Sequence, residues 1–214
     1  MTTTPRVRRL AVALLLALGA ATAHAGAYED FFTAVRRDNG SAIADLLARG
    51  MDPNTRDPQG NLALTLALRD ENLKAAEALM ASPTLDVDAP NAAGETALML
   101  AAIKGRTEWC RRLIERGAKV DRDGWTPLHY AASGPDADTV KLLLDRGAAI
   151  DARSPNGTTP LMMAARYGGQ TSAELLLARG ADRGRRNDLG LTAADFARGA
   201  GRDRLADQLA PPAK

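Results

Sequence analysis

The sequence predicts an all-α repeat fold, a solenoid of about five to six stacked helix-turn-helix repeats joined by β-hairpin-like fingers. A glycine-led segment recurs with spacings of 34, 30, 33 and 33 residues. A second recurring segment, LLARGMD at 46–52, LIERGAKVD at 113–121, LLDRGAAID at 143–151 and LLARGAD at 176–182, closes the repeats. A period of this length is typical of stacked repeats, because one such repeat cannot bury its apolar face alone. The glycine-led segments begin at Gly60, Gly94, Gly124, Gly157 and Gly190.

Residues 1–25, MTTTPRVRRLAVALLLALGAATAHA, have the three-part layout of a secretory signal peptide. Arg6, Arg8 and Arg9 precede an uncharged apolar run over 10–23, which is followed by the small-x-small sequence Ala-His-Ala. The run is shorter than the roughly 20 residues that a membrane span needs. We predict cleavage after Ala25, a periplasmic or secreted protein, and no stable membrane insertion afterwards. An uncleaved membrane anchor is the alternative.

The charge balance depends on this segment. The chain has 28 Lys and Arg against 26 Asp and Glu, a net charge of +2. Without the three arginines of residues 1–25 the count becomes 25 to 26, a net charge of −1. Nucleic-acid binding needs a basic face. The arginines between 183 and 204 alternate with aspartates, which is typical of a solvated surface, so we expect no nucleic-acid partner.

The repeats take up residues 26–209. We place them at 28–57, 58–90, 91–122, 123–153, 154–186 and 187–209, and we expect a flexible tail at 210–214. The first and last are degenerate, as expected for terminal repeats, which have one face in water.

The repeat at 123–153 shows which residues begin and end the helices of a repeat. Thr126 is a good N-cap, Pro127 suits the first helical position, and His129 at the third can hydrogen-bond back toward the cap. Gly147 is expected to end the second helix in a left-handed conformation. The pair Asn156-Gly157 indicates a turn at the end of the next finger.

These segments resemble the ankyrin repeat family. Thr126-Pro127-Leu128-His129 followed by Tyr-Ala-Ala matches the family signature T-P-L-H-x-A-A, and Thr159-Pro160-Leu161 matches it with Met162 at the histidine position. The resemblance covers about residues 28–209. It implies a structural role for these signature residues and the binding of another protein. We expect no cofactor. We expect a monomer.

Catalytic groups are scarce. After residue 25 the chain keeps one histidine, His129, and one cysteine, Cys110. Cys110 aligns with Val140, an inward position on the second helix, where cysteine behaves as a small hydrophobic residue. No spacing of ligands suggests a metal site, and no glycine-rich loop suggests a phosphate site. We therefore expect a noncatalytic protein. An enzyme that uses Cys110 is an alternative, and it predicts rapid labelling of the native thiol.

The resemblance also implies where a partner binds, at finger tips and at the exposed ends of first helices. Trp125 is the strongest candidate, because it directly follows the turn glycine and tryptophan is a common interface anchor. We expect it to be exposed, with a notch beside it where the finger at 120–124 is short. Trp109 aligns with Thr139 on the second helix, and we expect it to be half exposed. The other candidates are Glu95, Arg153, Asn156 and Arg186 in the fingers, and Arg69, Ile103, Lys104, Arg166 and Tyr167 on the helices.

Two functions fit this sequence. The first is a secreted adaptor or modulator that binds a protein through its concave face and finger tips. The second is a dedicated inhibitor, immunity or accessory protein for one periplasmic enzyme, which predicts a single tight partner and a change of that enzyme's activity on mixing.

Overall fold

The structure is a computed structural model that describes residues 26–210, and within this range it is built from helices and loops. The predicted signal peptide lies outside the described residues, as does the predicted tail beyond Ala210. The chain divides into an N-terminal unit that ends at Leu85 and a C-terminal unit that starts at Asp86. The predicted all-α repeat solenoid is confirmed. None of the described helices is long and apolar enough to cross a membrane.

The N-terminal unit contains two helix pairs. A helix over 26–36 precedes α2 (Gly40–Ala48), and α3 (Ala63–Arg69) precedes α4 (Leu73–Met80). Its core is formed by fully buried Phe31, Val35, Ile43 and Leu79. A single antiparallel bridge between Arg56 and Leu62 closes the finger that leads into α3.

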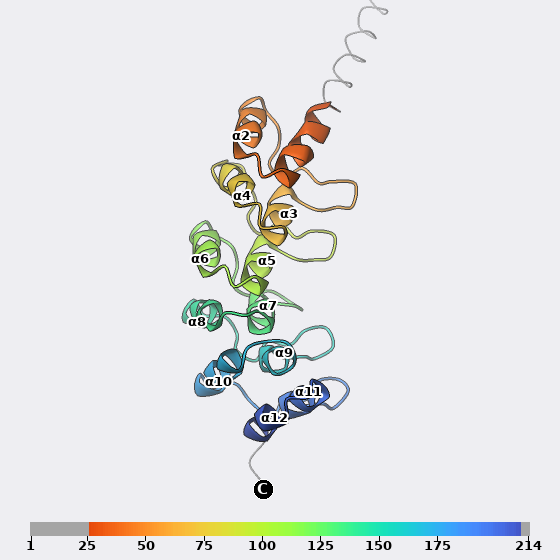
Figure 1. Ribbon diagram of the computed structural model, residues 1–214, viewed down its shortest axis with the longest axis vertical. Helices are drawn as coiled ribbons and strands as arrows, with labels where there is room; N and C mark the ends of the chain where they lie inside the picture. Colours follow the sequence, from red (N-terminus) through yellow and green to blue (C-terminus); the bar gives the residue numbers. More distant parts are fainter. Residues whose placement is uncertain (1–25, 211–214) are drawn as a thin grey trace, which may run out of the picture. The chain divides into compact units, whose positions relative to one another are not determined.

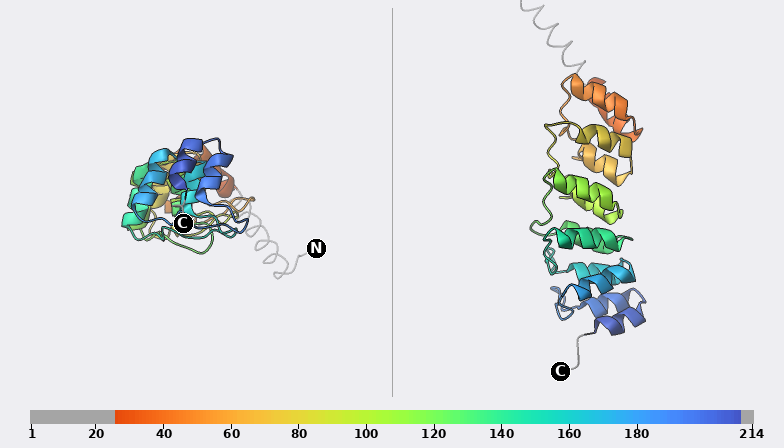
Figure 2. Two further views of the ribbon diagram at one scale, coloured as in Figure 1. Left: turned by 90° about the horizontal axis from the view of Figure 1, so that it is seen from below. Right: turned by 90° about the vertical axis from the view of Figure 1, so that its left-hand side faces the viewer.

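The C-terminal unit contains four helix pairs. They are α5 (Ala97–Ile103) with α6 (Thr107–Glu115), α7 (Pro127–Ser133) with α8 (Ala137–Asp145), α9 (Pro160–Arg166) with α10 (Gln170–Ala178), and α11 (Ala193–Gly199) with α12 (Asp203–Leu209). Figure 1 shows α5, α7, α9 and α11 in one row, with the fingers to their right, and packing runs along that row in chain order. In Figure 2 the second helices α6, α8 and α10 follow one another in the same order. Each repeat therefore packs on its neighbours in sequence.

Local sequence sets the helix ends as predicted. Thr126 and Thr159 are the N-caps of α7 and α9, and each is followed by a proline at the start of its helix. Gly147 has a φ of 89°, the left-handed conformation expected after α8. The starts of α7 and α9 and the end of α8 thus lie where short-range signals place them.

Neighbouring repeats approach so closely that some side chains do not fit. A Cβ on Gly134 would lie 2.8 Å from the carbonyl oxygen of Ile103, and one on Gly168 would overlap the carbonyl oxygen of Ala132. Absence of a side chain at these two positions allows the turns of successive repeats to touch. The first helices are short and rich in alanine, which permits the same close packing.

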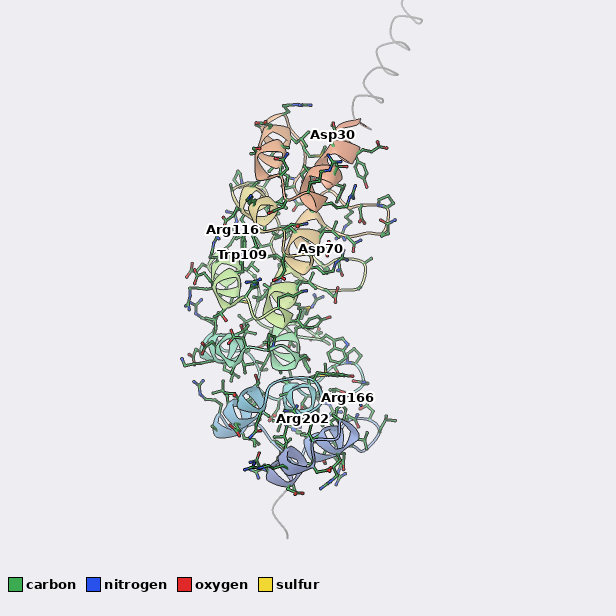
Figure 3. All side chains as sticks on the ribbon, in the orientation of Figure 1. Asp30, Asp70, Trp109, Arg116, Arg166 and Arg202 are labelled. Atoms are coloured by element: carbon green, nitrogen blue, oxygen red, sulfur yellow. The ribbon has the colours of Figure 1, made fainter. Side chains whose placement is uncertain are left out.

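The prediction that Trp109 is half exposed is wrong, because the residue is only 7% exposed. Trp109 lies on α6, which packs on both α5 and α8, and the Arg112 guanidinium covers its ring at 4.5 Å from the centroid. A second helix in the middle of a stack is covered by the helices on either side of it, so a residue that does not face its own first helix can still be buried. Figure 3 labels this tryptophan on α6.

Candidate partner-binding surface

His129 acts as a link between two repeats. Its Nδ1 lies 3.2 Å from the Thr126 backbone nitrogen, which donates to it, and 2.9 Å from the Thr126 hydroxyl. Its Nε2 lies 2.9 Å from the carbonyl oxygen of Thr158, in the finger of the next repeat. The side chain is fully buried, and burial lowers the pKa of the imidazole. A neutral ring that donates from Nε2 satisfies every one of these contacts.

Cys110 is fully buried on α6. Burial, with a smaller contribution from the negative charge of Asp136, raises the pKa of its thiol to about 12. A thiol of this kind is not ionised at neutral pH and is a poor nucleophile. The alternative of an enzyme using Cys110 is therefore not supported by the geometry. Among residues 26–210, no group of three or more His, Cys, Asp and Glu side chains is placed to hold a metal ion.

The fingers of the C-terminal unit are tied to one another by hydrogen bonds. Arg122 donates to the carbonyl oxygen of Gly94 at 2.8 Å, and Arg153 donates to Asp188 at 3.1 Å. Three aspartates near the ends of repeats accept backbone N–H groups of the following repeat: Asp88 from Lys119, Asp121 from Ala149, and Asp151 from Asp182. Sequence reasoning gave these aspartates no role, although Asp121 and Asp151 recur at the ends of the segments LIERGAKVD and LLDRGAAID.

The four candidates in the fingers all make contacts within the protein. Glu95 accepts from the Tyr130 hydroxyl at 3.1 Å and from the Asn91 amide at 2.9 Å. Burial, together with the charge of Glu95, raises the pKa of Tyr130 to about 12. The polar groups of the other three also point to neighbours: Arg153 to Asp188, Asn156 to Ser154 and Arg186 to the Gly190 carbonyl.

Trp125 is half-buried rather than exposed. Its ring packs edge-on against His129, with ring centroids 5.2 Å apart and planes at 77°. The notch predicted beside the short finger is present as an open cavity of about 400 Å³, lined by residues 121–124 and by Ala149, Ala152 and Arg153. Trp125 therefore supports the capping histidine and also borders the finger that forms this notch.

The helix-end candidates are more accessible. In the N-terminal unit, Arg69 pairs with Asp70 at 2.9 Å. In the C-terminal unit, Ile103 is 37% exposed and Tyr167 is 61% exposed, and Lys104 and Arg166 are exposed beside them. The Arg166 guanidinium lies 5.3 Å from the centroid of the Tyr167 ring. The exposed aromatic ring with an adjacent cation is a combination common in protein interfaces.

Arg202 was missed by sequence reasoning. Its guanidinium donates to the carbonyl oxygens of Ala164, Ala165 and Gly168, at 3.0, 2.9 and 2.9 Å. It therefore caps the C-terminal end of α9 from the next repeat, and Figure 3 shows it near Arg166. No short motif marks such a contact, because its acceptors lie more than 30 residues away in the chain.

Comparisons with known proteins agree with the geometry. The family model for ankyrin repeats (3 copies) matches residues 31–123 and 118–187. The chain is 35% identical over 131 residues to a putative palmitoyltransferase, ZDHHC13, of Danio rerio, covering 58% of this chain and 20% of that protein. It is 32% identical over 120 residues to the B-cell lymphoma 3 protein homolog of Mus musculus, covering 53% and 27%. The chain thus spans about a fifth to a quarter of these curated relatives.

A solved structure matches over nearly its whole length. It is a chain from the complex of the predatory endopeptidase Bd0816 of Bdellovibrio bacteriovorus with the immunity protein Bd3460. The TM-score is 0.70 at 25% sequence identity, and the match covers 84% of this chain and 97% of that chain.

Proposed function

Because the chain belongs to the ankyrin repeat family, whose repeats mediate protein–protein interactions, we propose that it is a noncatalytic module that binds another protein. The observation that supports this proposal most is a difference in exposure between the candidate catalytic side chains and the candidate binding side chains. Cys110 and His129 are buried and used in packing, whereas Ile103 and Tyr167 are exposed at helix ends beside cations. Exposed apolar side chains beside cations are suited to binding a partner protein of complementary shape and charge.

The binding proposal is tested with the chain from Gly26 to Lys214 immobilised as bait. An extract of the native host should contain one protein that is retained in stoichiometric amount. The test variant is Tyr167→Ala with Arg166→Ala, which removes the exposed pair and leaves the buried contacts intact. Trp125→Ala is a poorer probe, because it also removes the ring that packs on His129. Retention that is unchanged in the double variant would show that the partner uses another face.

We also propose that the protein acts outside the cytoplasm. The support is the layout of residues 1–25, with its arginines, apolar run and Ala-His-Ala sequence. The full chain, expressed in a bacterial host, should be recovered from the periplasm with Gly26 as its first residue. Recovery in the cytoplasm with residue 1 intact would contradict this proposal, and the binding proposal would be unaffected.

A second candidate function is that of an immunity-type inhibitor of a peptidase. It is favoured by the near-complete length match to a chain of the endopeptidase–immunity protein complex, since the curated relatives match only over part of their length. The test is to purify the peptidases encoded near this gene and mix each with the chain. Inhibition of one peptidase at a 1:1 ratio is expected; full activity of all of them in a molar excess of the chain would reject this candidate.

A further inference from the structure

One edge of the C-terminal unit is formed by the turns that join the first helix of each repeat to the second. We call it the turn edge and define it as residues 103–106, 133–136, 166–169 and 199–202. The turns are continuous along this edge. A Cβ on Gly105 would lie 2.8 Å from the Cβ of Asp136, Gly168 abuts Ala132, and Arg202 binds the carbonyl oxygens at the end of α9.

Charge is distributed unevenly between this edge and the fingers. The turn edge has four cations and one anion, Asp136. The fingers of the same unit, at 88–95, 121–125, 151–158 and 182–191, have seven acidic and five basic residues. Since each first helix begins after a finger and ends at a turn, the two groups lie at opposite ends of these helices. The unit is therefore positive at the turn edge and negative at the fingers.

Some charged side chains of the turn edge are engaged within the protein, and others are free to meet a partner. The Asp136 carboxylate accepts from the Thr107 and Thr139 hydroxyls at 2.6 and 3.1 Å, and Arg202 is occupied by backbone carbonyls. Lys104 is exposed and makes no ion pair with any residue of 26–210, and the Arg166 guanidinium lies over the neighbouring Tyr167 ring. Arg106 also interacts within the protein. Lys104 and Arg166 therefore have no carboxylate partner among the described residues, and each is adjacent to an exposed apolar side chain.

The apolar side chains have a definite spacing. Ile103 and Tyr167 lie two repeats apart, which corresponds to roughly 20 Å for helices packed 8–10 Å apart. The repeat between them carries small side chains, Ser133 and Gly134, followed by exposed Pro135. An extended segment of about six residues, or a helix of about thirteen, spans that length.

We infer that the turn edge is the docking surface for an acidic segment of a protein partner, with two apolar side chains that contact Ile103 and Tyr167 and carboxylates that pair with Lys104 and Arg166. The inference rests on the proposed protein-binding function and adds the location of the surface and the chemistry of the partner. Complementary charge would speed the encounter and orient the segment, while the apolar contacts would hold it.

The test uses a random 16-residue peptide library displayed on phage and selected on the chain from Gly26 to Lys214. We expect enriched peptides that are rich in Asp and Glu and contain two large apolar residues. Their Kd, measured by fluorescence anisotropy, should rise about tenfold for Lys104→Gln with Arg166→Gln and by a similar factor for Tyr167→Ala. The matched control is Lys119→Gln with Arg146→Gln, which removes the same charge elsewhere on the C-terminal unit and should leave the Kd unchanged.

Circular dichroism and a urea titration of each variant separate loss of binding from loss of folding, and Ile103→Ala serves as a second variant if Tyr167→Ala is unstable. Two results would reject the turn edge as the docking surface: enrichment of neutral or basic peptides, or acidic peptides whose Kd is the same for all variants. Neither result would contradict the proposal that the chain binds a protein. No enrichment at all counts against both proposals. Tighter binding to vesicles of anionic lipid, or to single-stranded RNA, than to any peptide also overturns the inference.

Discussion

Replacing His129 by methionine tests how neighbouring repeats are coupled. In the same position of their own repeats, Met99 and Met162 accept the N-cap backbone N–H through Sδ at 3.5 and 3.4 Å. Methionine therefore keeps the cap contact of Thr126, while the hydroxyl contact and the bond from Nε2 to Thr158 are lost. Each such hydrogen bond contributes about 1 kcal/mol, so the free energy of unfolding should fall by about 2 kcal/mol.

The same variant tests the protonation state of the buried imidazole. Burial lowers the folded-state pKa below the unfolded value of about 6.5. The unfolded chain then binds a proton that the folded chain does not, so stability is fully present above pH 6.5 and is lost as the pH falls toward the folded pKa. Between pH 7.5 and pH 5.5 this amounts to at most about 1.4 kcal/mol.

The assay is urea unfolding followed by circular dichroism at both pH values. The chain from Gly26 contains His129 as its sole histidine, so other side chains contribute little in this range. His129→Met should be less stable at pH 7.5 and should lose less stability on acidification than the parent chain. The reciprocal change, Met162→His, should add a pH dependence of the same sign. Equal acid-induced losses in the parent and in His129→Met would refute the reasoning.

The packing also predicts the effects of two substitutions and the reactivity of one thiol. Gly168→Ala should lower the free energy of unfolding by about 1–3 kcal/mol, because the added Cβ overlaps the Ala132 carbonyl. The control is Gly199→Ala, whose Cβ meets nothing within 4 Å and which should be neutral or stabilising. Thermal unfolding measures both. Arg202→Gln should lower the free energy of unfolding by about 1.5–3 kcal/mol, because it removes charge-assisted hydrogen bonds to backbone carbonyls. Arg204→Gln, at an exposed position in α12, is the control. The Cys110 thiol should react with a thiol reagent only as fast as the chain opens, and labelling of the native protein as fast as in urea would contradict its burial.

The prediction of the solenoid depended on signals that act over a few residues. Thr126 and Pro127 begin α7 and Gly147 follows α8 in the left-handed conformation, as their residue types indicate. Capping and turn preferences depend on the local backbone, and the period of the repeat is visible in the chain itself. The inward place of Cys110 followed in the same way from its alignment with Val140.

Contacts across repeats were beyond such reasoning. Trp109 is buried, although its place on the second helix indicated partial exposure, and Arg202 caps a helix that ends more than 30 residues earlier. Glu95 and Arg153 are engaged by neighbouring side chains, which their position in fingers did not reveal.

The sequence by itself determined the repeat family, the helix start at Thr126, the helix end at Gly147 and the structural use of His129, because each depends on local preferences and on a regular period. The tertiary structure alone decided which polar side chains are satisfied by neighbours and which remain available at the surface. That distinction depends on distances between residues about 30 positions apart. Stacking brings such residues together, and it leaves Ile103, Lys104, Arg166 and Tyr167 accessible on the turn edge.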